Sequence, residues 1–148
     1  AGGAARAFLY ALNNCGLSNI AISNRNSSKL SNLRKISDFK IIDWGKKKDY
    51  KADILINATP IGMFPKVDTI AFDEFNISNA RGIIDVVVNP IISKLIKKSE
   101  DMKKNFCPGY IMSMHQAKEQ FFLYTGVNPP LRLVEEKLML LLKLSEPV

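Results

Sequence analysis

The sequence has few of the residues that build metal centres and disulfide frameworks. Among 148 residues there are two cysteines, Cys15 and Cys107, and one histidine, His115. The cysteines lie far apart and form no C-x-x-C pair, which argues against zinc and against a disulfide scaffold. No metal is therefore expected, and this cysteine content fits a reducing cytoplasm best.

Long apolar runs, internal repeats and low-complexity tracts are also lacking. No stretch reaches the roughly 18 apolar residues that span a bilayer, so no membrane segment is expected. The 21 Lys and Arg against 14 Asp and Glu give a net charge of +7. The lysines are spread out and no aromatic side chains interleave with them as base-stacking platforms, so we favour solvated lysines over a nucleic-acid site. The length predicts one globular domain.

Strand and helix patterns alternate along the chain. Strands are predicted at 19–23, 39–42, 53–57 and 82–88; helices are predicted at 4–14, from Ser27 or Ser28 onward, and at 92–102, 112–124 and 131–144. This βαβ alternation predicts a doubly wound, mostly parallel sheet with helices on both faces. In such sheets ligands bind beyond the carboxyl ends of the strands, so the segments after the strands are the candidate site.

The first seven residues, A-G-G-A-A-R-A, resemble the end of a phosphate-binding turn that leads into a helix. In the pattern G-x-G-x-x-G/A, Gly2 and Ala5 take the second and third places. The first glycine and its strand would lie upstream of Ala1. We therefore expect the chain to be part of a longer protein.

The segment that follows the predicted strand at 19–23 indicates which dinucleotide binds. An NAD site has an Asp or Glu there for the ribose 2′-hydroxyl, whereas an Arg accommodates a 2′-phosphate. This chain has no carboxylate there and offers Arg25, with Lys29 four residues later. Solvated residues at a helix start are the alternative, but the glycine turn about twenty residues upstream favours NADP.

Five stretches together carry a resemblance to a known family. In order they are A-G-G-A-A-R-A, N-R-N-S-S-K, D-I-L-I-N-A-T-P-I-G-M, D-V-V-V-N-P and G-Y-I-M-S-M-H-Q-A. From Ala1 to about Pro130 the chain resembles the C-terminal NADP-binding domain of shikimate dehydrogenase. The resemblance implies a Rossmann-like fold and a cytoplasmic enzyme of aromatic amino acid biosynthesis that reduces 3-dehydroshikimate to shikimate with NADPH.

The resemblance also implies roles for individual residues. The pyrophosphate would lie on Gly2, Gly3 and Ala4. The adenosine phosphate would lie on Asn24, Arg25, Asn26 and Lys29, with Asn26 where the family has threonine. The middle of the cofactor would contact Ala58, Thr59 and Met63. The nicotinamide would lie by Val86, Gly109 and Met112.

Substrate contacts depart from the family pattern. Gln116 matches the glutamine that reaches the substrate hydroxyls, but Val88 stands where the family usually has a tyrosine that touches the substrate. Loss of that hydrogen bond would weaken substrate binding by roughly 1 kcal/mol. The family's G-x-G-M-L patch is here Gly109-Tyr110-Ile111-Met112-Ser113, so the substrate is less firmly predicted than the cofactor.

The family's acid/base pair, a Lys and an Asp, belongs to an N-terminal substrate domain. We therefore expect no catalytic residue in this chain. Residues 112–148 are expected to be helical and to pack partly on that domain, because the last helix is apolar on more than one stripe. His115 is expected at an ordinary helix position, and Asp85 to order a loop by hydrogen bonds.

Three further possibilities stay open at this point. The chain could belong to a relative that acts on quinate, or be a non-catalytic NADP-binding module that senses cofactor or scaffolds a partner. A homodimer is also left open.

Overall fold

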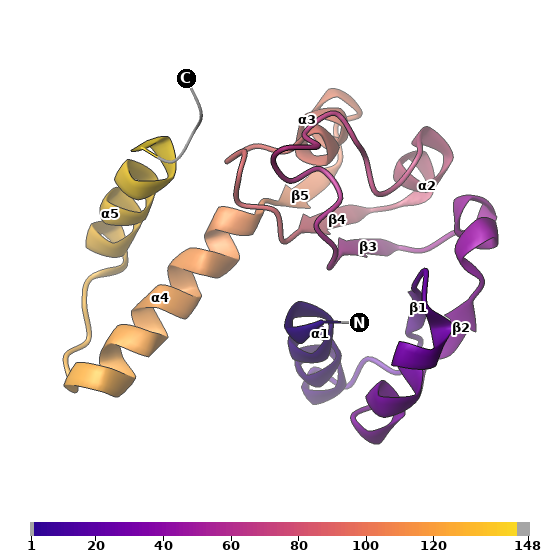
Figure 1. Ribbon diagram of the computed structural model, residues 1–148, viewed down its shortest axis with the longest axis horizontal. Coiled ribbons are helices and arrows are strands. Elements are labelled where there is room, and N and C mark those ends of the chain that lie inside the picture. Colours follow the sequence, from indigo (N-terminus) through magenta and orange to yellow (C-terminus); the bar gives the residue numbers. More distant parts are fainter. Residues whose placement is uncertain (1, 145–148) are drawn as a thin grey trace. The chain divides into compact units, whose positions relative to one another are not determined.

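The computed structural model describes residues 2–144, except for the side chains of residues 27, 29 and 144. The chain divides into two compact units, Ala1–Lys51 and Ala52–Val148. Figure 1 shows the helices and strands of both units, coloured along the sequence.

The first unit contains a pair of parallel strands. Its elements are helix α1 (Gly3–Asn14), strand β1 (Ala21–Ser23), 3₁₀ helix η1 (Ser27–Lys35), strand β2 (Lys40–Ile42) and 3₁₀ helix η2 (Trp44–Asp49). β1 and β2 pair in register from Ala21 with Lys40 to Ser23 with Ile42. The core consists of Leu9, Leu30, Leu33 and Phe39.

Helix α1 ends where the sequence predicts. Gly16 adopts φ +72°, a conformation that glycine takes without steric cost. Its N–H donates to the carbonyl of Asn13 at 2.9 Å, and the N–H of Leu17 donates to the carbonyl of Leu12 at 3.0 Å. These two bonds form a Schellman motif that satisfies the last carbonyls of the helix.

The second predicted helix differs from expectation at its start and in its type. Asn26, and not Ser27 or Ser28, is the N-cap, because its side-chain oxygen accepts from the N–H of Ser28 at 3.1 Å. The element is a 3₁₀ helix, not an α-helix. Its serine and asparagine residues compete with the backbone for hydrogen bonds, which disfavours a regular α-helix.

The second unit contains a three-stranded parallel sheet. Its elements are β3 (Ile54–Asn57), α2 (Glu74–Asn79), β4 (Gly82–Asp85), α3 (Lys94–Asp101), β5 (Asn105–Cys107), α4 (Gly109–Thr125) and α5 (Leu131–Leu144). The strand order is β3-β4-β5, and both pairings are parallel. The expected parallel pairing of strands is therefore confirmed. The strands form two sheets, one of two strands and one of three.

One face of this sheet carries the core of the second unit. Leu55 of β3 and Ile83 of β4 are paired in register and are buried against Ile77 of α2 and Leu95 of α3. Because side chains alternate across a strand, the next residues on the same face are Asn57 and Asp85. A polar buried pair therefore continues the apolar core at the carboxyl ends of β3 and β4.

Strand β4 is shorter than the predicted 82–88 and ends at Asp85. The carboxylate of Asp85 accepts a hydrogen bond from the N–H of Val87 at 3.1 Å. A side chain that bonds the backbone two residues ahead turns the chain out of the strand conformation.

Three short elements of the structure were not predicted from the sequence. They are η2, α2 and β5.

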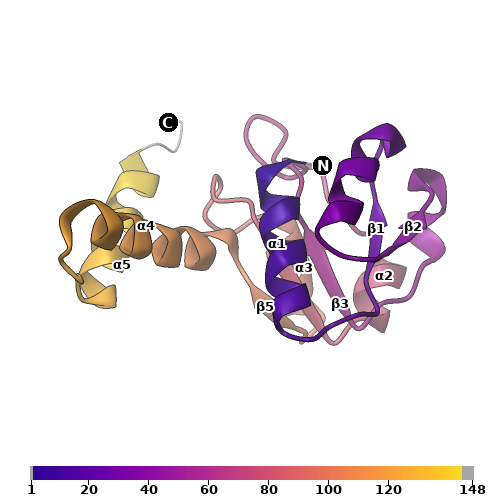
Figure 2. The same cartoon turned by 90° about the horizontal axis from the view of Figure 1, so that it is seen from below.

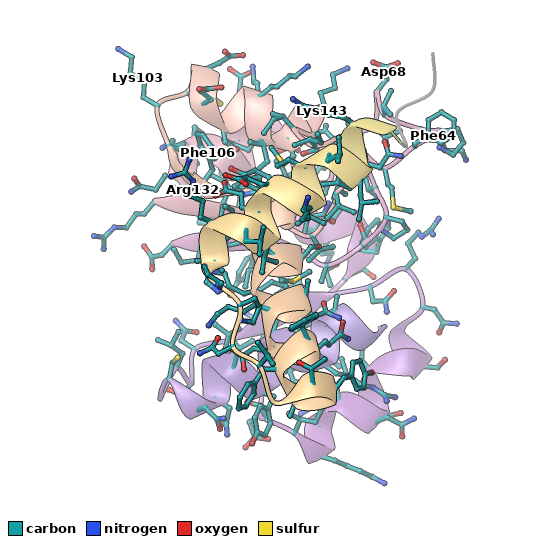
Figure 3. All side chains as sticks on the ribbon, turned by 90° about the vertical axis from the view of Figure 1, so that its left-hand side faces the viewer. Phe64, Asp68, Lys103, Phe106, Arg132 and Lys143 are labelled. Atoms are coloured by element: carbon teal, nitrogen blue, oxygen red, sulfur yellow. The ribbon has the colours of Figure 1, made fainter. Side chains whose placement is uncertain are left out.

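Helices α4 and α5 form an antiparallel pair. Figures 1 and 2 show α4 running away from the three-stranded sheet, with α5 folded back alongside it. Gly126, at φ +71°, ends α4. Many apolar side chains of the pair are exposed, among them Leu123, Tyr124 and Leu141. The side chains along α5, between the labelled Arg132 and Lys143, can be followed in Figure 3.

Within residues 2–144, none of the helices has the length and apolar character needed to cross a membrane.

Candidate functional site

The carboxyl ends of three parallel strands define the candidate site of the second unit. β3, β4 and β5 end at Asn57, Asp85 and Cys107. The segments that follow them begin with Ala58, Val86 and Pro108-Gly109. In an open parallel sheet these segments lie at one edge, which is where ligands of α/β folds bind.

The first two strand ends are joined by a buried hydrogen bond. The Asn57 Nδ2 donates to Asp85 Oδ1 at 2.9 Å, and both residues are only 1% exposed. Ser93, the N-cap of α3, donates from its hydroxyl to Asp85 Oδ2 at 2.5 Å. Burial raises the pKa of Asp85, and the hydrogen bonds from Ser93, Val87 and Asn57 oppose this effect. The expectation that Asp85 orders a loop is confirmed.

The turn after β3 is held by Asn57. Its Oδ1 accepts from the N–H of Thr59 at 3.1 Å and from the Thr59 hydroxyl at 2.6 Å, while Nδ2 also donates to the carbonyl of Ile61 at 3.1 Å. The Thr59 Oγ1 in turn accepts from the N–H of Ile61 at 3.2 Å. Because the hydroxyl is used inside the turn, Thr59 offers a ligand mainly its methyl group and its backbone. Ala58 is half-buried, and Met63 is exposed.

Glycine at position 109 allows α4 to begin directly on the segment after β4. A Cβ added at Gly109 would lie 2.6 Å from the carbonyl carbon of Val86, and closer still to the carbonyl oxygen of Val87. Any side chain here would displace the helix. Gly109 and Val86, both predicted beside the nicotinamide, are therefore brought into contact.

The face of α4 that begins at Gly109 carries the other two predicted residues. Met112 and Gln116 follow at intervals of three and four residues, so the three positions share one face of the helix. With a rise of about 1.5 Å per residue, Gln116 lies roughly 10 Å along the axis from Gly109. Met112 is half-buried, and Gln116 is exposed.

Two loops of the second unit are tied together beside this edge. The N–H of Phe64 donates to the carbonyl of Asn89 at 2.9 Å. This bond connects the loop after β3, which holds Met63, to the loop after β4, which holds the half-buried Val88.

His115 is exposed on α4, which agrees with an ordinary helix position.

The first unit contains an open helix N-terminus. Gly2 is the N-cap of α1, and among the described residues no side chain caps this end. Nothing lies within 4 Å of a Cβ placed at Gly2 or Gly3, so backbone N–H groups there are approachable. A long helix with free N-terminal amides favours anions such as a pyrophosphate. Ala4 lies in the first turn and is half-buried.

A hollow of about 310 Å³ lies in the same unit, beyond the carboxyl ends of β1 and β2. Its lining residues are Asn24, Arg25, Ile41, Ile42, Asp43 and Trp44. Two isoleucines and the Trp44 ring can contact an adenine ring, and the Arg25 guanidinium can bind a phosphate beside it. The Asp43 carboxylate in the same lining disfavours an anion, so the hollow combines features for and against the phosphate of an adenosine.

The other predicted residues of this segment are less available. The Asn26 side-chain oxygen is occupied by the N–H and the hydroxyl of Ser28, at 3.1 and 2.6 Å. Asn24 accepts from the N–H of Asn26 at 3.3 Å. Lys29 lies in η1, and its side chain is outside the described part of the structure.

Sequence reasoning missed four residues that shape these sites. Asn57 and Ser93 hold the second-unit network, and Asp43 and Trp44 line the first-unit hollow. Asn57 belongs to the N-A-T-P-I-G-M motif, so the motif itself could have signalled it. Ser93 could have been found as a serine before an apolar helical pattern, the usual N-cap signal.

Comparisons with known proteins give close relatives over most of the chain. No family model matches it. The chain is 37% identical over 131 residues to the shikimate dehydrogenase (NADP(+)) of Maridesulfovibrio salexigens, covering 86% of this chain and 47% of the relative. It is 34% identical to the enzyme of the same name from Methanosphaera stadtmanae, covering 94% and 53%. The chain is a homologue of part of the shikimate dehydrogenases. It spans about half the length of these curated relatives.

Solved structures agree with this assignment. A shikimate 5-dehydrogenase-like protein matches with a TM-score of 0.84 and 31% identity over 93% of this chain and 51% of its own. Quinate dehydrogenase from Corynebacterium glutamicum, in complex with NAD, matches with a TM-score of 0.83 and 28% identity over 94% and 52%. The expected Rossmann-like fold of the shikimate dehydrogenases is confirmed.

Proposed function

We propose that the chain is the cofactor-binding part of an NADP-dependent shikimate dehydrogenase. The enzyme transfers a hydride reversibly between NADPH and the carbonyl carbon of 3-dehydroshikimate, and a proton on the oxygen completes shikimate. The observation that carries the proposal is the 37% identity to an enzyme of that name over 86% of the chain. The second unit supports it as well, because polar residues stand at the ends of β3 and β4 and a glycine, Gly109, follows β5.

The first unit binds the adenosine and phosphate end in this proposal. The amides of Gly2, Gly3 and Ala4 hold the pyrophosphate at the N-terminus of α1. Arg25, exposed at the rim of the hollow, forks onto the 2′-phosphate. Asn24, Asn26 and Lys29 complete this end. The two amide side chains act through the turn they shape, since their oxygens bond backbone N–H groups.

The second unit binds the nicotinamide end. Ala58, Thr59 and Met63 flank the middle of the cofactor, and Val86, Gly109 and Met112 flank the ring. The cofactor supplies the hydride, while these residues orient the ring and exclude water from it. The close contact of Gly109 with Val86 supports this assignment, because it brings two of the proposed ring contacts together.

Substrate contacts come from Gln116 and Val88. The exposed amide of Gln116 can both donate to and accept from substrate hydroxyls. Val88 offers only apolar contact at its position. The proton donor belongs to a part of the enzyme outside this chain, and the apolar faces of α4 and α5 pack on that part. We place the enzyme in the cytoplasm, where the free thiols of Cys15 and Cys107 would persist.

Turnover by the full-length gene product tests the proposed function. Reduction of NADP⁺ with shikimate should exceed reduction with quinate, and should exceed reduction of NAD⁺ with shikimate. Faster turnover of quinate would make the protein a quinate dehydrogenase. The structural neighbour from Corynebacterium glutamicum has that name. Binding of NADP⁺ without turnover of either substrate would indicate a non-catalytic module.

A further inference from the structure

Asp85 is a buried carboxylate that none of the proposed ligand contacts requires. It is only 1% exposed, so it does not reach a bound molecule. Its hydrogen-bond partners nevertheless adjoin the proposed nicotinamide contacts. Asn57 immediately precedes the turn 58–63, and Val87 follows Val86.

Asp85 determines which way the Asn57 amide faces. The Oδ1 of Asp85 accepts from the N–H of Val87 at 3.1 Å, so this oxygen is an acceptor. The nitrogen end of the Asn57 amide must therefore face it, as the 2.9 Å bond requires. The amide oxygen is left facing Thr59, where it accepts both the backbone N–H and the hydroxyl.

The same carboxylate also fixes the start of α3. Its second oxygen accepts from the Ser93 hydroxyl at 2.5 Å, while Ser93 Oγ accepts from the N–H of Ile96 at 3.3 Å. One buried group thus connects the turn after β3, the segment after β4 and the N-cap of α3. Buried networks in which the polar groups are satisfied hold a single geometry, because any alternative leaves a group unpaired.

We propose that Asp85 is a positioning residue for the nicotinamide end of the cofactor, acting through Asn57 on the turn 58–63 and through its bond to Val87 on the segment after β4. The inference rests on the proposed function, because it assumes that these two segments flank the nicotinamide. The residues that form this network, Asn57, Asp85, Val87 and Ser93, belong to the second unit, whereas the adenosine end is assigned to the first.

The test compares two ligands that share the adenosine end. NADP⁺ uses both ends of the proposed site, whereas adenosine 2′,5′-bisphosphate lacks the nicotinamide end. In the full-length gene product, Asp85→Ala should weaken NADP⁺ binding by about tenfold, the effect of losing one hydrogen-bonded link. Binding of adenosine 2′,5′-bisphosphate should stay unchanged.

Two control variants separate positioning from general stability. Asp85→Asn keeps an acceptor for Asn57 and Val87 and can donate to Ser93, so NADP⁺ affinity should return close to that of the wild type. Ser99→Ala removes a fully buried hydroxyl of the same unit, which bonds only the Leu95 carbonyl among the described contacts, at 2.8 Å. It should lower stability without changing the affinity for either ligand.

The outcomes are distinguishable. Equal weakening of both ligands in Asp85→Ala, or no weakening of either, overturns the positioning role while leaving the proposed function intact. Failure of the wild-type protein to bind NADP⁺ overturns the proposed function itself. If Asp85→Ala does not fold, Asn57→Ala carries the same expectation, because it breaks the link to the turn and leaves Asp85 bonded to Ser93 and Val87.

Discussion

Gly109, the first residue of α4, packs directly on the backbone carbonyl of Val87. A helix normally gains up to about 1 kcal/mol when Ala replaces Gly. Here the added methyl group would meet backbone atoms that cannot rotate away. We predict that Gly109→Ala lowers the free energy of unfolding by about 1–3 kcal/mol, the usual cost of overpacking. Urea denaturation measures this change.

Gly3→Ala is the matched control for this substitution. Gly3 also stands in the first turn of a helix, but nothing lies within 4 Å of a Cβ placed there. The same replacement should therefore leave stability unchanged or raise it slightly. Equal effects of the two substitutions would show that helix propensity, and not contact with Val87, governs position 109.

Stability should depend on pH through Asp85. Burial raises the pKa of Asp85 above its ordinary value of 3.8. The folded state therefore holds this proton more tightly than the unfolded state does. The resulting stabilisation is complete below pH 3.8 and is lost as the pH rises through the folded pKa.

Asp85→Asn isolates this contribution, because an amide does not titrate. The free energy of unfolding of the wild type minus that of Asp85→Asn should fall as the pH rises from below 3.8 toward neutrality. Other groups titrate alike in both proteins and cancel in the difference. A difference that rises with pH would mean that the hydrogen bonds to the carboxylate outweigh its burial.

The alternation of patterns predicted the main elements, but not the contacts between them. Local patterns located α1, α5, β3 and α4: helical spacing of apolar residues for α1, a largely apolar helix for α5, a continuous apolar centre for β3 and the run of helix-forming residues for α4. The bond from Asn57 to Asp85 joins residues 28 apart and depends on the register of β3 with β4. A single sequence contains the two residues but not that register.

Short elements and helix starts were the hardest to predict. η2 consists of Trp44–Asp49, whose lysines show no apolar period. α4 begins at Gly109, three residues before the predicted 112. Glycine is a poor helix former, and only the close approach to Val86 explains its place there. The family motif indicated that residue 109 belongs to the candidate site. It could not indicate that the residue packs against Val86, because that contact depends on the fold.

Restoring the family's tyrosine should strengthen substrate binding. Val88 is half-buried and offers no polar group. We predict that Val88→Tyr lowers the KM for shikimate of the full-length enzyme about fivefold, the equivalent of one hydrogen bond of roughly 1 kcal/mol. Val88→Phe is the control, because it adds the ring without the hydroxyl. An equal effect of both variants would assign the gain to apolar contact.

The α4 and α5 pair should make the isolated chain associate. Leu123, Tyr124 and Leu141 are 77%, 84% and 64% exposed. Exposed apolar faces of this kind promote association and bind hydrophobic dyes. We expect the chain alone to sediment as more than a monomer. The double variant Leu123→Lys and Leu141→Lys should reduce both dye binding and association, and a monodisperse wild-type monomer without dye binding would contradict this expectation.

Preference for NADP⁺ over NAD⁺ tests the central claim most directly. Both affinities should be measured by calorimetric titration of the full-length protein and of Arg25→Ala, with Arg34→Ala as a control. Arg34 carries the same charge in the same unit but lies over the Phe39 ring, 5.2 Å from its centroid. We predict that the wild type and Arg34→Ala bind NADP⁺ at least about tenfold more tightly than NAD⁺, and that Arg25→Ala loses this preference. Equal affinity of the wild type for both cofactors, or an unchanged preference in Arg25→Ala, would contradict the account.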